Sequence, residues 1–272
     1  QEGQNVTYTN VVTAGNCTPV AGFFLTDTLP SHVTYVSGGT YNAANRTVTT
    51  SPVNVSTGAT QNYPFIVTVN PGSYFAPVTH LTETVTSGSI PAAWTASSIN
   101  GTAWSVSTTV SNSPSNSFAA LYNVSAANDL SLATTAQYTL TPNTDANYST
   151  LTFWHRYNTE EGWDGGVVEI STNNGGTWTD LGSNFISNGY NAALGGGSNL
   201  GTRNAFTGTT AGFIKSVVDL SSYKGQSIRI RFRFGSDNNT GPTTGVGGWW
   251  IDDIEIKSEP AVRMKTNMFN PS

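Results

Sequence analysis

Short runs of β-branched and aromatic residues alternate with clusters of Gly, Pro, Asn and Asp along most of the chain, and helical periodicity is almost absent. This pattern is typical of β-sandwiches and barrels, in which short strands are separated by turn residues. The runs predict strands at residues 5–12, 20–26, 33–36, 46–50, 63–69, 104–109, 117–122, 136–141, 150–157, 166–171, 177–181, 213–219, 227–234 and 249–256. We therefore predict an all-β chain.

Residues 227–234 give the strictest alternation. Ile228, Ile230, Phe232 and Phe234 occupy one face of the predicted strand, and Arg229, Arg231 and Arg233 occupy the other. Such alternation predicts an antiparallel strand that has one face in the core. The arginine face is interpreted as a solvated sheet surface, with a ligand-binding ladder as the alternative.

The segment Gly247-Gly-Trp-Trp-Ile-Asp-Asp-Ile-Glu-Ile256 contains a second informative strand. Strict alternation would place Trp250, Asp252, Ile254 and Ile256 on the core face and Asp253 on the opposite face. A carboxylate that points inward must be paired, hydrogen-bonded or bound to a metal. Asp252 is therefore predicted to be a structural ligand or a hydrogen-bond hub.

The turn signal Asn70-Pro71-Gly72 separates two blocks of predicted strands. We place the domain boundary near residues 72–76, which divides the chain into domains at residues 1–74 and 75–258. Residues 259–272 lack the strand pattern and are interpreted as a linker or tail that leads to something beyond this chain.

The first block contains Asn5-Val-Thr-Tyr-Thr, Leu25-Thr-Asp-Thr-Leu-Pro30, Val33-Thr-Tyr-Val-Ser-Gly-Gly39 and Phe65-Ile-Val-Thr-Val69, in that order. Over about residues 3–70 it resembles the Ig-like repeat of bacterial surface proteins. The resemblance implies an Ig-like β-sandwich that serves as a spacer, with its usual first strand missing or shortened. Asp27 would then be a turn residue that organises the loop before Pro30.

The second block contains Leu151-Thr-Phe-Trp-His-Arg-Tyr-Asn-Thr-Glu160, Trp163-Asp-Gly-Gly-Val-Val-Glu-Ile170, Val218-Asp-Leu-Ser-Ser-Tyr-Lys-Gly225 and the Trp-Trp-Ile-Asp-Asp-Ile segment. In this order they resemble the MAM-like and cleaved-adhesin-like modules of surface adhesins and of secreted bacterial metallopeptidases. The resemblance covers most of residues 77–258. It implies an antiparallel jelly-roll β-sandwich with a structural Ca²⁺.

Calcium requires six to eight oxygen ligands, so acidic residues beside these motifs are the candidates. Glu160-Glu161-Gly-Trp-Asp164 concentrates three carboxylates in five residues, which is costly unless a cation or an arginine offsets the repulsion. The alternative is a solvated acidic loop, with Asp252 satisfied by backbone N–H groups. The predicted ligands are Asp252, Asp129, Glu160, Asp164 and Glu83, of which Asp129 is placed in a loop and Glu83 on a first strand.

Ser171-x-Asn173-x-Gly175-x-Thr177-Trp178 matches the Asp-box pattern, with Asn in the place of Asp. Such a box is a β-hairpin whose turn is fixed by the Ser, Asx and Gly positions. Trp163, Tyr190 and Trp249, with Trp94, are the aromatic candidates for a carbohydrate-binding surface, which requires flat, exposed rings.

Catalysis has little support in the sequence. His32, His80 and His155 are dispersed, no zinc-peptidase motif is present, and His155 is expected to be a hydrogen-bonded structural residue. A pair of carboxylates for glycoside hydrolysis could be drawn from Glu160, Asp164 and Glu169, but nothing in the sequence places two of them across a cleft.

The net charge of −5 and the 10% of charged residues give no reason to expect nucleic acid as a partner. No apolar run is long enough to span a bilayer, so no membrane insertion is expected. Cys17, the single cysteine, is interpreted as a small apolar filler. The chain does not begin with Met, which indicates a mature product or an excised fragment.

These observations favour a non-catalytic segment of a larger secreted or cell-surface bacterial protein that binds protein or glycan at the cell surface. Three alternatives remain open. They are an accessory region of a secreted metallopeptidase, a carbohydrate-binding module, and a fibre subunit that self-assembles through edge strands.

Overall fold

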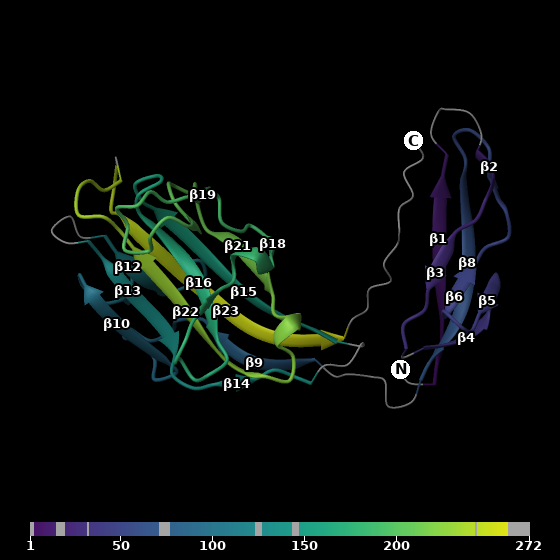
Figure 1. The fold of residues 1–272 in the computed structure, drawn as a ribbon, viewed down its shortest axis with the longest axis horizontal. Coiled ribbons are helices and arrows are strands. Elements are labelled where there is room, and N and C mark those ends of the chain that lie inside the picture. Colours follow the sequence, from purple (N-terminus) through teal and green to yellow (C-terminus); the bar gives the residue numbers. More distant parts are fainter. Residues whose placement is uncertain are drawn as a thin grey trace. The chain divides into compact units, whose positions relative to one another are not determined.

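A computed structural model describes residues 3–14, 20–31, 33–70, 77–122, 127–142, 147–242 and 244–260 (Figure 1). The chain forms two compact units. We call them the first unit, whose main segment is Gln1–Ala76, and the sandwich unit, which comprises Pro77–Asn143 and Tyr148–Ser258. The predicted boundary at 72–76, Cys17, His32 and residues 261–272 of the predicted tail lie outside the described residues.

The first unit is built from short antiparallel strands in small sheets. One sheet has the order β1-β8-β4, a second has the order β3-β6-β5, and β2 pairs with β7. The strands are β1 (Asn5–Thr13), β2 (Val20–Phe23), β3 (Thr26–Thr28), β4 (Val33–Ser37), β5 (Thr40–Asn42), β6 (Thr47–Thr49), β7 (Val53–Val55) and β8 (Thr60–Val69). Leu29, Val33, Val48, Phe65 and Val67 form its main apolar cluster.

The prediction that Asp27 is a turn residue is wrong. Asp27 lies within β3, where it pairs with Val48 of β6, and its buried carboxylate accepts a hydrogen bond from the Asn10 amide. The Leu29-Pro30 turn is instead held by Arg46, whose guanidinium donates to the carbonyl oxygens of Leu29 (3.2 Å), Pro30 (2.6 Å) and Val33 (2.7 Å). Three carbonyl acceptors on one guanidinium fix this loop without an acidic side chain.

The sandwich unit contains two large sheets. One has the order β10-β13-β22-β16-β17, and the other has the order β11-β12-β23-β15-β21-β18, with β9 also paired to β23 (Figure 1). The strands are β9 (Val78–Glu83), β10 (Trp94–Asn100), β11 (Ser105–Ser107), β12 (Ser117–Leu121), β13 (Asp129–Thr134), β14 (Tyr138–Thr139), β15 (Asn147–Asn158), β16 (Gly165–Ser171), β17 (Thr179–Asp180), β18 (Phe185–Ser187), β19 (Ala192–Ala193), β20 (Asn204–Ala205), β21 (Ile214–Asp219), β22 (Ser227–Gly235) and β23 (Gly248–Pro260), with short 3-10 turns η1 (Gly182–Asn184) and η2 (Ser221–Tyr223).

The core of this unit lies between the two sheets. Phe153 of β15 packs edge to face against Phe232 of β22, with ring centroids 5.1 Å apart, and Phe232 also contacts Trp249 of β23. In β22 the four predicted core residues are fully buried, so its alternation is confirmed. The prediction of an all-β chain with an antiparallel β-sandwich is also confirmed. Among the described residues, no helix is long and apolar enough to cross a membrane.

The alternation predicted for β23 is wrong because the strand changes phase in its middle. Trp249, Ile251, Ile254 and Ile256 belong to the core cluster, and Trp250 does not. Ile251 and Ile254 are three positions apart, which regular alternation cannot place on one face. Asp253 has a φ of +47°, and this left-handed residue supplies the irregularity.

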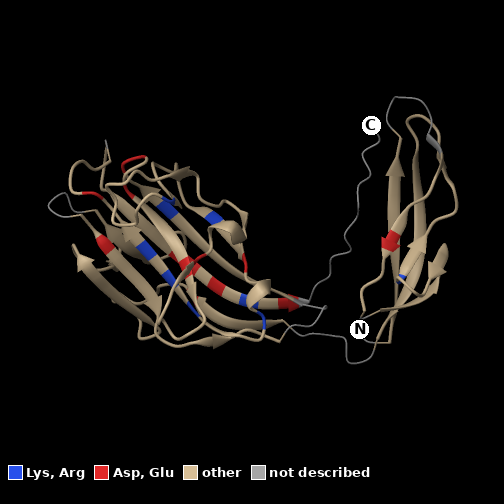
Figure 2. Ribbon diagram, in the orientation of Figure 1, with Lys and Arg blue, Asp and Glu red and all other residues tan. Residues whose placement is uncertain are grey.

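Charged residues are distributed unevenly. Among the described residues of 3–70, Asp27 and Arg46 are the charged residues, whereas the sandwich unit carries acidic and basic residues on its sheets and loops (Figure 2). Candidate chemistry that depends on charge therefore lies in the sandwich unit.

Candidate cation site in the sandwich unit

Three carboxylates meet at one end of the sandwich unit. Glu160, Asp164 and Asp237 each offer an oxygen, and these oxygens lie within 4.8 Å of one another. Asp164 is fully buried, and the other two are half-buried. Oxygen donors at this density are the ligands that a hard divalent cation such as Ca²⁺ prefers. We call this group the carboxylate cluster.

Strand pairing explains why these residues meet. Glu160 and Asp164 belong to the loop between β15 and β16, and Asp237 follows the end of β22. Because β16 and β22 are antiparallel with Gly165 opposite Gly235, the residue before β16 lies beside the residues after β22. Inside the loop, the Glu160 carbonyl oxygen accepts the N–H groups of Trp163 (3.2 Å) and Asp164 (3.0 Å), which forms a tight turn.

Each of the three carboxylates has one oxygen fixed by the protein. The Thr240 hydroxyl donates to Glu160 Oε2 (2.6 Å), the Asp237 N–H donates to Asp164 Oδ1 (3.2 Å), and the Asn239 N–H donates to Asp237 Oδ1 (2.9 Å). Asp164 Oδ2 is buried and has no hydrogen-bond partner among the described residues. A buried carboxylate oxygen without a partner is costly, so this atom requires a ligand.

Repulsion among the charges of the carboxylate cluster also favours a bound cation. Among the described residues, none of its three members forms an ion pair, because the salt bridges involve other carboxylates. Two charges about 5 Å apart repel by roughly 3 kcal/mol at an effective dielectric constant of about 20. Burial, and then repulsion by Asp237 and Glu160, raise the pKa of Asp164 to about 7, although backbone hydrogen bonds oppose the change.

The charges of the carboxylate cluster also affect the pKa of Tyr122. Burial, followed by the charges of Asp164, Asp237 and Glu160, raises the pKa of its hydroxyl to about 12. The hydroxyl donates to the carbonyl oxygen of Thr240, the residue whose side chain holds Glu160. Tyr122 therefore supports the loop that contributes to the site, and its neutral hydroxyl adds no charge.

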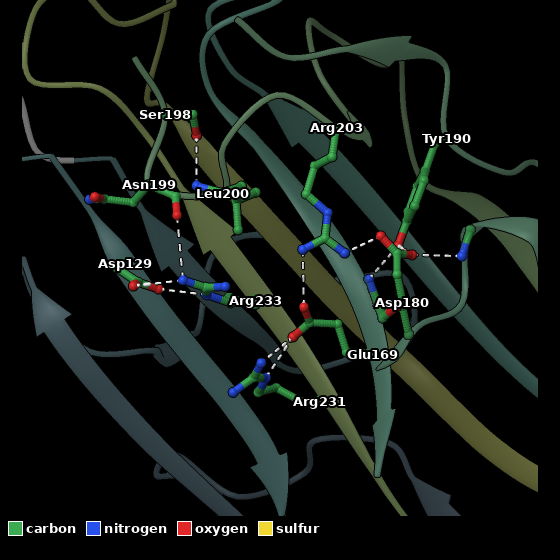
Figure 3. Close-up of polar contacts among 12 residues, drawn as sticks. Asp129, Glu169, Asp180, Tyr190, Ser198, Asn199, Leu200, Arg203, Arg231 and Arg233 are labelled. Atoms are coloured by element: carbon green, nitrogen blue, oxygen red, sulfur yellow. Dashed lines mark hydrogen bonds and ion pairs between the residues drawn. The ribbon is translucent and has the colours of Figure 1, made fainter. Parts of the chain in front are cut away.

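The other predicted calcium ligands do not join this cluster. Asp129 is not in a loop but is the first residue of β13, and both of its oxygens accept bonds from Arg233, each at 2.8 Å (Figure 3). Glu83 lies on β9 and accepts bonds from Trp94 Nε1 (3.2 Å) and the Val85 N–H (2.8 Å). Existing donors therefore satisfy the carboxylates of both residues.

Asp252 is a hydrogen-bond hub, which is the alternative that the sequence left open. It is fully buried, and its Oδ2 accepts the N–H groups of Asn112 (2.8 Å) and Ser113 (3.0 Å), while Oδ1 accepts that of Asp253 (2.8 Å). Asp253 binds the side chains of the same two loop residues. Burial raises the pKa of Asp252, and the three backbone bonds oppose that rise. Together the two aspartates pin the loop before β12.

Three of the four aromatic candidates are not exposed. Trp249 is completely buried, Trp94 is 4% exposed, and Tyr190 is half-buried with its hydroxyl bonded to the Val168 N–H (2.8 Å) and to Asp180 (3.0 Å). A Cβ added to Gly166 would lie 2.3 Å from the Trp249 ring, so a glycine is required beneath it. Trp163 is different, because 44% of its surface is exposed and it belongs to the loop of the carboxylate cluster.

The arginine face of β22 is neither a plain solvated surface nor an open ladder. Arg231 binds Glu169, Arg233 binds Asp129, and Arg203 bridges Glu169 and Asp180 (Figure 3). Arg231 also stacks over Trp178 at 4.4 Å. These arginine side chains are only 19–23% exposed. We call the three arginines and the carboxylates that they bind the arginine network. Glu169, the third candidate for glycoside hydrolysis, belongs to it.

Two smaller predictions agree with the geometry. The Asp-box segment forms the β16–β17 turn, in which Ser171 Oγ accepts the Gly175 N–H (2.8 Å) and Asn173 Oδ1 accepts that of Thr177 (2.8 Å). His155 is fully buried between Ser216 Oγ (2.8 Å) and Trp249 Nε1 (3.1 Å). Because the indole donates to Nδ1, the imidazole proton is on Nε2. Burial lowers the pKa of His155 to about 3.

A shallow pocket of about 550 Å³ lies beside η1 and β18. Asp180, the charged residue among those that line it, is already bound by Arg203, Tyr190 and the Gly182 N–H. The pocket therefore presents mainly neutral groups, and the carboxylate cluster does not line it.

Asp237 is the ligand candidate that the sequence analysis missed. Its signal was the polar run Ser236-Asp-Asn-Asn239 directly after the best strand of the chain. Pairing that strand with residues 165–171 would have placed Asp237 beside Asp164. The alternation alone does not reveal which strands pair.

The chain matches no protein-family model, and no curated protein matches it. Among solved structures, it is similar to the K2 cleaved adhesin domain of Lys-gingipain, with 23% identity, 66% of this chain and 97% of that one covered, and a TM-score of 0.39. The K1 cleaved adhesin domain of Lys-gingipain from Porphyromonas gingivalis W83 gives 20% identity, coverages of 67% and 98%, and a TM-score of 0.39.

A xylan-binding domain from Paenibacillus barcinonensis Xyn10C gives 12% identity, coverages of 70% and 99%, and a TM-score of 0.38. These TM-scores are low.

Proposed function

We propose that the chain is a non-catalytic extracellular recognition segment whose sandwich unit uses Ca²⁺ to organise the loops at one end. Glu160, Asp164 and Asp237 would hold the ion. The observation that carries this proposal is the buried Asp164 carboxylate. Its Oδ2 has no hydrogen-bond partner among the described residues, and one of its oxygens lies within 4.8 Å of oxygens of Glu160 and Asp237. A divalent cation would relieve both the missing bond and the repulsion.

Calcium is preferred to the other common ions for chemical reasons. The donors are all oxygens, which disfavours zinc and copper, ions that select nitrogen and sulfur. The ligands come from two loops and not from one rigid element, and Ca²⁺ tolerates such irregular geometry better than Mg²⁺ does. The bound ion would link the β15–β16 loop to the residues after β22.

Titration calorimetry of Ca²⁺ into the whole, chelator-treated chain tests the proposal. We expect one binding site, weaker binding of Mg²⁺, and loss of the site in Asp164→Asn. Glu161→Gln is the matched control, because this exposed carboxylate lies in the same loop but outside the carboxylate cluster. Absence of Ca²⁺ binding to the native chain would overturn the proposal. The roles as a metallopeptidase accessory region and as a fibre subunit stay predictions.

A further inference from the structure

The exposed ring of Trp163 stands beside the carboxylate cluster. A Cβ added to Gly197 would lie 3.3 Å from Trp163 Cζ3 and 3.5 Å from Asp237 Cβ, so the indole and this carboxylate residue flank one point. Gly195 also approaches the same ring edge, and its N–H donates to the Gly162 carbonyl oxygen at 2.6 Å. The glycines thus hold one edge of the indole while 44% of the side chain stays exposed.

The three carboxylates of the cluster supply only part of the coordination that Ca²⁺ requires. One oxygen of each carboxylate accepts a hydrogen bond from the protein, and the buried Asp164 Oδ2 accepts none from the described residues. If the three carboxylates each contribute one oxygen, roughly three or more of the six to eight positions remain for other oxygens. These positions can take water or the hydroxyl groups of a ligand.

The net charge of the cation site discriminates between anionic and neutral ligands. The three carboxylates are not ion-paired with Lys or Arg among the described residues, so a bound divalent cation would leave the site with a net negative charge. The whole chain is also acidic, with a net charge of −5. Phosphate and carboxylate groups are therefore disfavoured, whereas neutral hydroxyls lose nothing to this repulsion.

We infer that the site binds a neutral saccharide through the cation. This inference rests on the proposed function, because the ion must be present. Two adjacent hydroxyls of one sugar ring would replace water on Ca²⁺, and an apolar C–H face of the sugar would lie against the exposed indole of Trp163. A flat aromatic ring provides contact area at low conformational cost, and coordination to the ion would fix the orientation of the sugar.

Binding of the whole chain to immobilised neutral oligosaccharides of glucose, galactose, mannose and xylose tests the inference, with and without Ca²⁺. We expect binding to at least one sugar only with Ca²⁺, and a loss of about tenfold or more in affinity in Trp163→Ala. Asp164→Asn should abolish binding, and Glu161→Gln should retain it. Trp163→Ala should still bind Ca²⁺ by calorimetry, which separates the sugar contact from the ion site.

Each other outcome would overturn the inference in a distinguishable way. If Ca²⁺ binds and no neutral sugar does, the saccharide inference fails and the cation proposal stands. Sugar binding that survives chelation would exclude the bridging ion and point to the pocket lined by Asp180 and Tyr190. If Ca²⁺ does not bind, both proposals fail together.

Discussion

Asp129 and Asp164 flank the same end of β22 and differ in what surrounds them. Asp129 pairs with Gly235 from the β13 side, and Asp164 precedes Gly165, which pairs with Gly235 from the β16 side. Both residues are buried. Arg233 forms two hydrogen bonds with Asp129, whereas two further carboxylates surround Asp164.

The difference shows that burial alone does not identify a ligand site. A buried carboxylate with a guanidinium beside it is a structural group, and its pairing is complete within the chain. A buried carboxylate beside like charges, with one oxygen unbonded, is incomplete until a cation arrives. The Asp129–Arg233 pair and the carboxylate cluster are therefore opposite arrangements of buried carboxylates at the same end of β22.

Removal of Arg233 should give the largest loss of stability. Arg233→Met leaves the Asp129 carboxylate buried without its partner, and we expect the free energy of unfolding to fall by about 3 kcal/mol. Arg229→Met on the same strand is the matched control. Among the described residues, Arg229 donates to the carbonyl oxygens of Thr134 and Asn174 and forms no ion pair. It should cost about 1 kcal/mol. Denaturant unfolding measures both, and equal losses would contradict the pairing account.

His155 is a third kind of buried group, partnered but uncharged. Its pKa is about 3 in the folded chain and near 6.5 when unfolded, so the unfolded chain takes up the proton first as the pH falls. Burial of the neutral imidazole therefore costs no stability above about pH 6.5. Its cost to the free energy of unfolding grows as the pH falls toward about pH 3. We expect a loss of about 1.4 kcal/mol for each pH unit.

The measurement is the free energy of unfolding at several acidic pH values in the Asp164→Asn chain, so that Asp164 takes no part. Replacement of His155 by Gln tests the assignment, since the variant should lose this slope. If the slope is the same with and without His155, the buried neutral imidazole does not cause it.

Asp164→Asn should stabilise the cation-free chain, in contrast to the effect of Arg233→Met. The substitution removes one charge from a repelling group, and we expect a gain of about 1 kcal/mol at neutral pH. Glu161→Gln should change stability by less than about 0.5 kcal/mol, as exposed substitutions usually do. Denaturant unfolding in the presence of a chelator measures both. A destabilised Asp164→Asn chain would contradict the repulsion that we assign to the cluster.

Trp163→Ala tests whether the indole, of which 44% is exposed, lies beside the ion. The expected effect is spectroscopic. Terbium ions substitute for Ca²⁺ and luminesce when a nearby indole is excited, so the native chain should sensitise bound terbium and the variant should lose most of that emission. Excitation at a wavelength that tyrosine does not absorb excludes Tyr122. Retained emission would mean that Trp163 does not lie beside the ion.

Residue patterns predicted the strands well where side chains alternate strictly. The strand at 227–234 shows this, since its core face follows from the sequence alone. They missed β13, in which only Leu130 and Leu132 mark the core face and small residues follow, so the apolar run is short. They also failed in β23, where the left-handed Asp253 shifts the phase.

The candidate site was predicted in part for a similar reason. Glu160 and Asp164 are close in sequence, so their crowding is visible in the chain itself. Asp237 arrives through the pairing of β16 with β22, and Asp129 is removed from the site by Arg233 on the next strand. Both facts depend on strand register, which no local pattern encodes.

Thermal unfolding of the whole chain with Ca²⁺ and with a chelator tests the central claim most directly. We predict that Ca²⁺ raises the melting temperature of the sandwich unit and leaves the first unit unchanged. The rise should be absent in Asp164→Asn and intact in Glu161→Gln. An equal melting temperature with Ca²⁺ and chelator, or a rise that persists in Asp164→Asn, would contradict the assignment of Asp164 as a cation ligand.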